Sequence, residues 1–198
     1  MSGRPPVLRP VPAQPQVQRN LARLALAPAG ARADVVVIPQ VLGGPQGVVD
    51  ITVPSNRMFV RVDWWARSNS VNAGDILFLN FNGDVGANYD YENVGFLGAV
   101  VPAPAQAIGV NNLRVGLVPG AAAGAGLWNV GWFVVGVVNQ TGARRGYTSA
   151  GFRNDNAFGF EMNSGAWHNT VDPVRSMRLT IAGAPSFLAG SVFTTMAW

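Results

Sequence analysis

The alternation of apolar and polar positions is clearest between Arg57 and Arg67. Two sets of side chains alternate there: Met58, Val60, Val62, Trp64 and Ala66 on one face, and Arg57, Arg61, Asp63 and Arg67 on the other. A period of two is typical of a strand that buries one face in an antiparallel sheet. The segment Asp75–Phe81 is instead almost continuously apolar, which predicts a strand at the centre of a sheet.

Turn residues divide the rest of the chain after Asp34 into short apolar segments. Turns are predicted at 43–45, 82–84, 139–142 and 182–185, where Gly, Pro, Asn and Asp gather. Further strands are predicted at 35–38, 48–53, 94–101, 108–118, 128–138, 145–153, 158–162, 174–181 and 187–198. About ten short strands at roughly ten-residue spacing, with no helix, predict an all-β domain. We expect an antiparallel β-sandwich of the jelly-roll-like kind.

Residues 1–33 differ in composition from the rest of the chain and predict an extended arm ahead of a domain at 34–198. Five prolines in its first half, Pro5, Pro6, Pro10, Pro12 and Pro15, oppose helix and favour extended geometry. Around Leu21 and Leu24 the chain could form two helical turns before Pro28. A disordered tail is the alternative. The apolar residues of the arm favour a segment that becomes ordered against other subunits.

Composition adds a reason to expect neighbouring subunits. Charged residues make up only 12% of the 198 residues, against about 25% in a typical soluble domain. A freely diffusing monomer normally carries more charge for solubility. We therefore expect neighbours to cover much of this surface.

The positive charge belongs to the arm, in which five arginines precede the first acidic residue: Arg4, Arg9, Arg19, Arg23 and Arg32. The other nine arginines meet ten acidic residues, so the arm carries about +5 and the domain about −1. The arm could neutralise nucleic-acid phosphates. Because its arginines are interleaved with Pro and Leu, we favour protein partners, with Leu21 and Leu24 among the contact residues.

Several function classes find little support in the sequence. There is no Cys for a disulfide or a thiol site, and the only His is His168, beside Trp167. A catalytic triad or a zinc site lacks its usual residues, so we expect neither an enzyme nor a cofactor. No apolar run reaches about 18 residues, and Pro interrupts the N-terminus, so we expect neither a membrane span nor a signal peptide. A cytoplasmic origin followed by assembly into a particle fits these features.

Two groups of side chains could still form a site. Asn82, Asp84, Asn88 and Asp90 offer oxygen ligands for Ca²⁺, with Glu92 nearby, although the spacing is not that of an EF-hand. The favoured alternative is that these residues form turns by bonding their own backbone. Two of Asp75, Asp84 and Asp90 could also act as a glycosidase pair, but no pattern places two of them across a cleft.

The tryptophans allow two interpretations. Six are present: Trp64, Trp65, Trp128, Trp132, Trp167 and Trp198. They could line a glycan-binding face, but Trp in a β-sandwich more often belongs to the core or to a subunit interface.

Two segments resemble a known group of proteins. The first runs from Leu77 through Phe81-Asn82-Gly83-Asp84 to Asn88-Tyr89-Asp90-Tyr91. The second is C-terminal: Gly165-Ala166-Trp167, Val174-Arg175-Ser176-Met177-Arg178-Leu179, Phe187 and Ala189-Gly190-Ser191. This order resembles virion proteins of tailed bacteriophages, of the minor tail, head-fibre or capsid decoration type. They share an F-N-G-D-x-G-x-N-Y loop and a C-terminal F-x-x-G-S hairpin.

The resemblance covers about residues 56–198 and implies a particle subunit. The chain departs from the pattern at its end, where Thr194-Thr195-Met196-Ala197-Trp198 replaces a Leu-Tyr-Gly-like terminus. The leading hypothesis is a capsid decoration, or cement, protein. Its partners would be the major capsid protein, other virion proteins and further copies of itself, for which a cyclic trimer is one arrangement.

Two other virion roles stay open. One is a tail or fibre component that binds a host glycan or another tail protein. The other is the coat protein of a small icosahedral virus, with the arm facing the genome.

Overall fold

The computed structural model describes residues 35–97, 103–124, 126–137, 145–154 and 158–198. The chain divides between Asp34 and Val35, and the arm, with all of its predicted contact residues, lies outside the described part. Every regular element in the described part is a β-strand, which confirms the all-β prediction. No helix in this part is long and apolar enough to cross a membrane.

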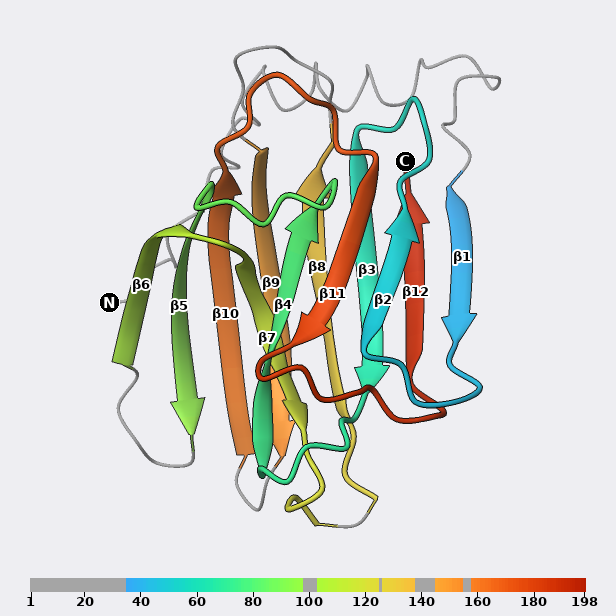
Figure 1. The fold of residues 1–198 in the computed structure, drawn as a ribbon, viewed down its shortest axis with the longest axis vertical. Helices are drawn as coiled ribbons and strands as arrows, with labels where there is room; N and C mark the ends of the chain where they lie inside the picture. The colour runs from blue at the N-terminus through green and yellow to red at the C-terminus, as the bar shows by residue number, and fades with distance from the viewer. Residues whose placement is uncertain (1–34, 98–102, 125, 138–144, 155–157) are drawn as a thin grey trace, which may run out of the picture. The chain divides into compact units, whose positions relative to one another are not determined.

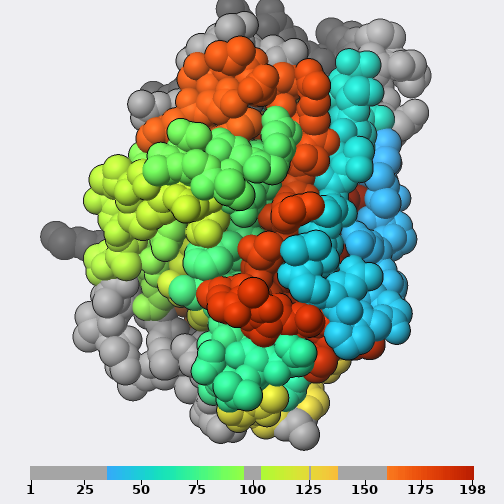
Figure 2. Space-filling model, in the orientation of Figure 1, coloured from blue at the N-terminus to red at the C-terminus, as the bar shows by residue number. Residues whose placement is uncertain are grey.

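Twelve strands form two antiparallel sheets (Figure 1). The strands are β1 (Val36–Val41), β2 (Val48–Thr52), β3 (Phe59–Ala66), β4 (Gly74–Phe81), β5 (Tyr89–Leu97), β6 (Ala103–Val110), β7 (Leu113–Pro119), β8 (Asn129–Gly136), β9 (Arg145–Asn154), β10 (Phe158–Trp167), β11 (Ser176–Ile181) and β12 (Val192–Ala197). The larger sheet has the order β1-β12-β3-β8-β9-β10-β5-β6, and the smaller one the order β2-β11-β4-β7. In Figure 2 the smaller sheet and its loops lie in the middle of the visible face, between β1 (blue) and β6 (yellow-green) of the larger sheet.

The core lies between the inner faces of the two sheets. Leu77, Leu79 and Phe81 of β4 are fully buried, as are Phe133 of β8 and Trp167 of β10. Phe81 packs on Trp167 with ring centroids 5.4 Å apart, a separation typical of favourable aromatic pairs. β4 lies between β11 and β7, so the prediction of a central strand at 75–81 is confirmed.

The predicted alternation at 58–66 is confirmed for β3, whose Val60, Val62, Trp64 and Ala66 are buried. Met58 precedes the strand and is 58% exposed. Arg67 was expected on the polar face, and this is wrong because the strand ends at Ala66. The Arg67 side chain is 8% exposed, and its guanidinium donates to four carbonyl oxygens of the loop after β7: those of Gly120, Ala123, Gly124 and Leu127.

The segment predicted as one strand over 108–118 is two strands in different sheets. β6 ends at Val110 and lies at the edge of the larger sheet, whereas β7 begins at Leu113 in the smaller sheet. The Pro- and Ala-rich stretch between the strands predicted at 94–101 and 108–118 belongs to β6. Pro104 is tolerated there because an edge strand leaves some N–H groups unpaired. The predicted turn at 139–142 lies outside the described residues.

A buried ion pair joins the two sheets. Arg114 of β7 donates from Nε to Oε1 of Glu161 at 2.7 Å and from Nη2 to Oε2 at 2.6 Å. The two side chains are 19% and 6% exposed. Two parallel bonds fix the geometry of both partners, so this pair sets how β7 crosses β10.

We predict that Arg114→Met lowers the free energy of unfolding by about 3 kcal/mol, because the buried Glu161 carboxylate loses its partner. The double variant Arg114→Met with Glu161→Met should recover most of this loss. Chemical denaturation of the wild type and both variants measures the effect. Equal stability of all three would contradict a structural role for the pair.

Candidate protein interface on the larger sheet

The outer face of the larger sheet is apolar over the four strands β1, β12, β3 and β8. Because side chains alternate along a strand, the residues between the buried positions of β12, β3 and β8 point outward. β1 has no buried residue, and its outward residues are those that pair with outward residues of β12. These are Val37, Pro39 and Val41 of β1, Val192, Thr194 and Met196 of β12, Phe59, Arg61, Asp63 and Trp65 of β3, and Val130, Trp132 and Val134 of β8. We call this set the apolar half of the outer face.

Strand register places these side chains in rows across the four strands. One row runs Val41, Val192, Trp65, Val130, and another runs Val37, Met196, Arg61, Val134. Val41 is 65% exposed, Val37 55%, Val130 50% and Trp65 49%. Contiguous exposed apolar surface of this kind marks contact sites for partners.

Arg61 and Asp63 carry the only charges among the outward side chains of these four strands, all of which the structure describes. Arg61 Nε donates to Asp63 Oδ1 at 2.8 Å, and the Arg61 guanidinium lies 5.0 Å from the ring of Trp132. The apolar half is therefore electrically neutral, with one charge of each sign at its centre.

Aromatic pairs stand at both ends of β3. Trp65 packs on Trp128 at 5.2 Å between ring centroids, and Phe59 stacks on Trp198 at 6.0 Å. Arg67 helps to position the first pair, because its guanidinium donates to carbonyl oxygens of the loop that ends at Trp128. These contacts reduce the conformational freedom that the aromatic side chains would lose on binding a partner.

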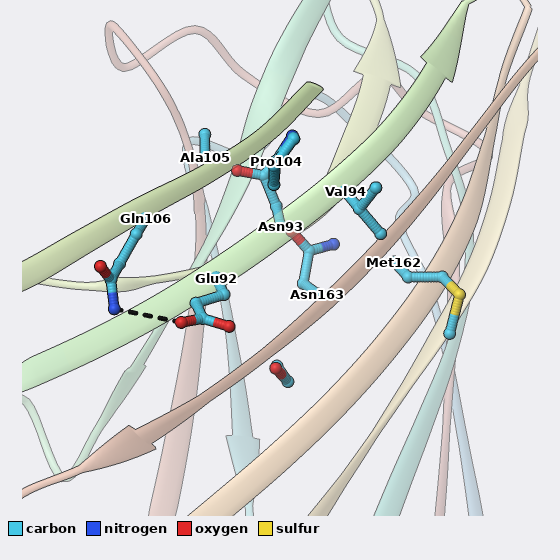
Figure 3. Close-up of a pocket in the computed structure, with 9 residues that line it drawn as sticks. Glu92, Asn93, Val94, Pro104, Ala105, Gln106, Met162 and Asn163 are labelled. Atoms are coloured by element: carbon cyan, nitrogen blue, oxygen red, sulfur yellow. Dashed lines mark hydrogen bonds between the residues drawn. The ribbon is translucent and has the colours of Figure 1, made fainter. Parts of the chain in front are cut away.

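A groove of about 510 Å³ lies across β10, β5 and β6 (Figure 3). Six of its lining side chains share one face by strand alternation: Glu92, Val94, Pro104, Gln106, Met162 and Ser164. Met162 is 47% exposed, and Gln106 Nε2 donates to Glu92 Oε1 at 3.1 Å. We call this the groove half of the outer face. It offers an apolar row beside a polar row that contains a carboxylate.

The tryptophans divide between the core and the outer face of the larger sheet. Trp64 and Trp167 are buried in the core. The other four lie on or beside the apolar half: Trp65, Trp128, Trp132 and Trp198. The interpretation of tryptophan as a core residue is therefore confirmed for Trp64 and Trp167.

The four oxygen-bearing residues proposed as calcium ligands close loops in the structure. Asn82 accepts at Oδ1 from the N–H groups of Arg175 and Ser176. Asp84 accepts from Gly86 N–H and from Asn88 Nδ2, and Asp90 accepts from Gly109 N–H. These contacts favour the turn-forming alternative. In the described part of the chain no cluster of three His, Cys, Asp or Glu side chains could hold a metal ion.

Asp84 also connects its loop to the larger sheet. Trp167 Nε1 donates to Asp84 Oδ2 at 2.7 Å. The buried Tyr89 hydroxyl accepts from Phe81 N–H at 3.0 Å and donates to the backbone oxygen of Asp84 at 3.0 Å. These bonds join Phe81, Asp84, Asn88, Tyr89 and Trp167 into one hydrogen-bonded clasp between β4, β5 and β10.

The pKa values of two clasp residues are shifted. Burial acts to raise the pKa of Asp84, but the hydrogen bonds from Trp167, Gly86 N–H and Asn88 outweigh it, so the pKa is lowered. Burial raises the pKa of Tyr89 to about 12, and the nearby Asp84 carboxylate adds to this. At neutral pH the clasp thus contains an ionised carboxylate and a neutral phenol.

The remaining candidates for chemistry also have structural partners. His168 Nε2 lies 2.7 Å from Asp90 Oδ2 at the end of β10. Asp75 is 5% exposed and accepts from Ser68, Ser70 and Asn72 in the loop before β4. Asp75 and Asp84 stand at opposite ends of β4 and are therefore not a catalytic carboxylate pair.

We predict that Asp84→Asn lowers the free energy of unfolding by about 1 to 2 kcal/mol at pH 7, because charge-assisted hydrogen bonds are lost. A lowered folded-state pKa stabilises the fold above the unfolded-state pKa of about 4. This stabilisation is lost as the pH falls through the folded-state value. Denaturation curves at several pH values should show the wild type and the variant converging below about pH 4, while the exposed control Asp172→Asn stays close to wild type.

Comparison with known proteins adds no relative to these observations. No family model, no curated protein and no solved structure matches the chain.

Proposed function

We propose that this protein is a structural subunit of a tailed-bacteriophage particle, and that it decorates the capsid shell. One observation carries the proposal: over β1, β12, β3 and β8, the outer face of the eight-stranded sheet exposes aromatic and aliphatic side chains around one ion pair. Such a face is stable in water at high concentration only when another protein covers it. Its function is binding, to the shell and to neighbouring subunits.

The two halves of the face suit different contacts. The apolar half is broad and neutral, as the centre of a subunit interface is. The groove half carries the Glu92 carboxylate beside Val94 and Met162, so it suits a partner segment with basic and apolar side chains. The major capsid protein is the expected partner of the groove half.

The arm and the clasp support the same proposal in different ways. An arm of about +5 ahead of a nearly neutral domain provides a tether between subunits. Binding through the arm and the domain together increases avidity without requiring either contact to be strong. In the loop that resembles the phage proteins, Asp84, Asn88 and Tyr89 each form a hydrogen bond of the fold.

A tail or fibre component that binds a host glycan is a second candidate. The exposed Trp65 beside Trp128 favours it, because sugar rings stack on tryptophan faces. The row that contains Trp65 is otherwise aliphatic, and it offers none of the polar partners that a sugar needs for its hydroxyls. A protein partner therefore fits better.

We predict that the protein occurs in many copies in purified particles of the virus that encodes it, as quantified by mass spectrometry. Recombinant full-length chain should rebind to particles that lack it. Met162→Glu should lower occupancy about tenfold, because it adds a negative charge beside Glu92 in an apolar contact. The exposed loop variant Val171→Glu is the matched control. Absence of the chain from purified particles would refute the proposal.

Removal of residues 1–33 tests the tether. We predict a truncated protein with an unchanged thermal midpoint of unfolding but at least tenfold lower particle occupancy, because one of two linked contacts is gone. Occupancy equal to that of the full chain would show that the arm does not contribute to docking.

A further inference from the structure

We propose that the apolar half of the outer face binds the same face of a second copy of this chain, with Arg61 of each copy opposite Asp63 of the other. This inference deepens the proposed function, since it assigns one half of the face to a contact between subunits and leaves the groove half for the shell. It depends on the arrangement of side chains along β3.

The single ion pair selects the relative direction of the two copies. Arg61 and Asp63 are two residues apart on β3, so they share a face and lie about 6.8 Å apart along the strand. Suppose that the two sheets meet face to face about a two-fold axis that lies between them, runs across the strands and passes over Val62. The two β3 strands are then antiparallel, and each Arg61 meets the partner's Asp63. The parallel arrangement would place Arg61 against Arg61, which costs several kcal/mol once solvent is excluded.

The same axis brings the aromatic ends of β3 together. Phe59 and Trp65 lie equally far from Val62, so each Phe59 faces the Trp65 of the other copy. They are 39% and 49% exposed, and each already rests on an aromatic neighbour, Trp198 or Trp128. Two mixed clusters of four aromatic rings would form, one at each end of the contact. Aromatic anchors of this kind carry much of the energy of protein interfaces.

The same two-fold axis also pairs the outward residues of the neighbouring strands. By register, the axis passes over Phe133 of β8, Thr195 of β12 and Ile38 of β1. The outward residues then pair across it as Trp132 with Val134, Thr194 with Met196, and Pro39 with Val37. None of these pairs leaves a charge without a partner. The apolar half is therefore self-complementary, as a contact between identical faces requires.

The area predicts how tight the contact is. Four strands spaced about 4.8 Å apart and about seven residues long present roughly 400 to 500 Å² of flat sheet. Sheet twist turns the distant strands β10, β5 and β6 away from the partner. This area lies below the roughly 800 Å² per partner of a standard stable interface. We therefore expect a dimer that dissociates at micromolar concentrations, and that becomes fully formed where the particle concentrates its subunits.

Charge reversal tests the proposal with the full-length chain. Sedimentation equilibrium over about 1 to 100 μM should show a monomer–dimer equilibrium for the wild type. Arg61→Asp and Asp63→Arg should each raise Kd at least tenfold, because like charges then oppose each other. An equimolar mixture of these two variants should dimerise again, since one copy then carries two acidic side chains and the other two arginines. The double variant with both changes should return to within about threefold of the wild-type Kd.

Several results would overturn the proposal. These are a wild type that stays monomeric at all concentrations, single reversals that leave association unchanged, a mixture that does not associate, and a mass that indicates a trimer. Thermal unfolding of each variant, at sites about 38% exposed, should confirm that the fold survives. If the protein stays monomeric but its binding to particles still depends on Met162, the contact between copies is refuted and the proposed function stands.

Discussion

A sheet has two faces, and in this protein only one face of the larger sheet is covered by the smaller sheet. The smaller sheet has four strands and lies against one face of the larger sheet, which has eight. The inner faces therefore bury Leu77, Phe81, Phe133 and Trp167, while the opposite face remains in contact with solvent. Ordinarily such a face is polar. Here it is apolar over β1, β12, β3 and β8, and this departure supports the proposed binding role.

The two sheets are joined by polar contacts as well as by the core. Arg114 and Glu161 connect β7 to β10 through two short bonds. At another point Asp84 binds Trp167, and Tyr89 binds the end of β4. Each of these side chains bonds a partner far along the chain or across a turn, so each helps to specify one packing of the two sheets. Residues that look like ligands in the sequence are used here to hold the fold.

The low charge of the chain and its apolar outer face are related. A chain with 12% charged residues has too little charge to cover its surface, and the structure concentrates the shortage on one sheet face. The loops carry several of the remaining charges, such as Asp172 and Arg175. The division suits the proposed role of a particle subunit, which contacts neighbours on one side and solvent on the other.

The sequence by itself determined the fold class, the central position of β4 and the alternation of β3, because each depends on the local period of apolar residues. It also favoured turn formation over metal binding at Asn82 and Asp84. Tertiary structure alone decided that Arg67 is buried, since its four carbonyl partners lie far along the chain. It alone separated β6 from β7, because only the sheet order shows that the two strands belong to different sheets. The outer face could not be predicted either: alternation shows that two faces exist, but only the sheet order shows which one the second sheet covers.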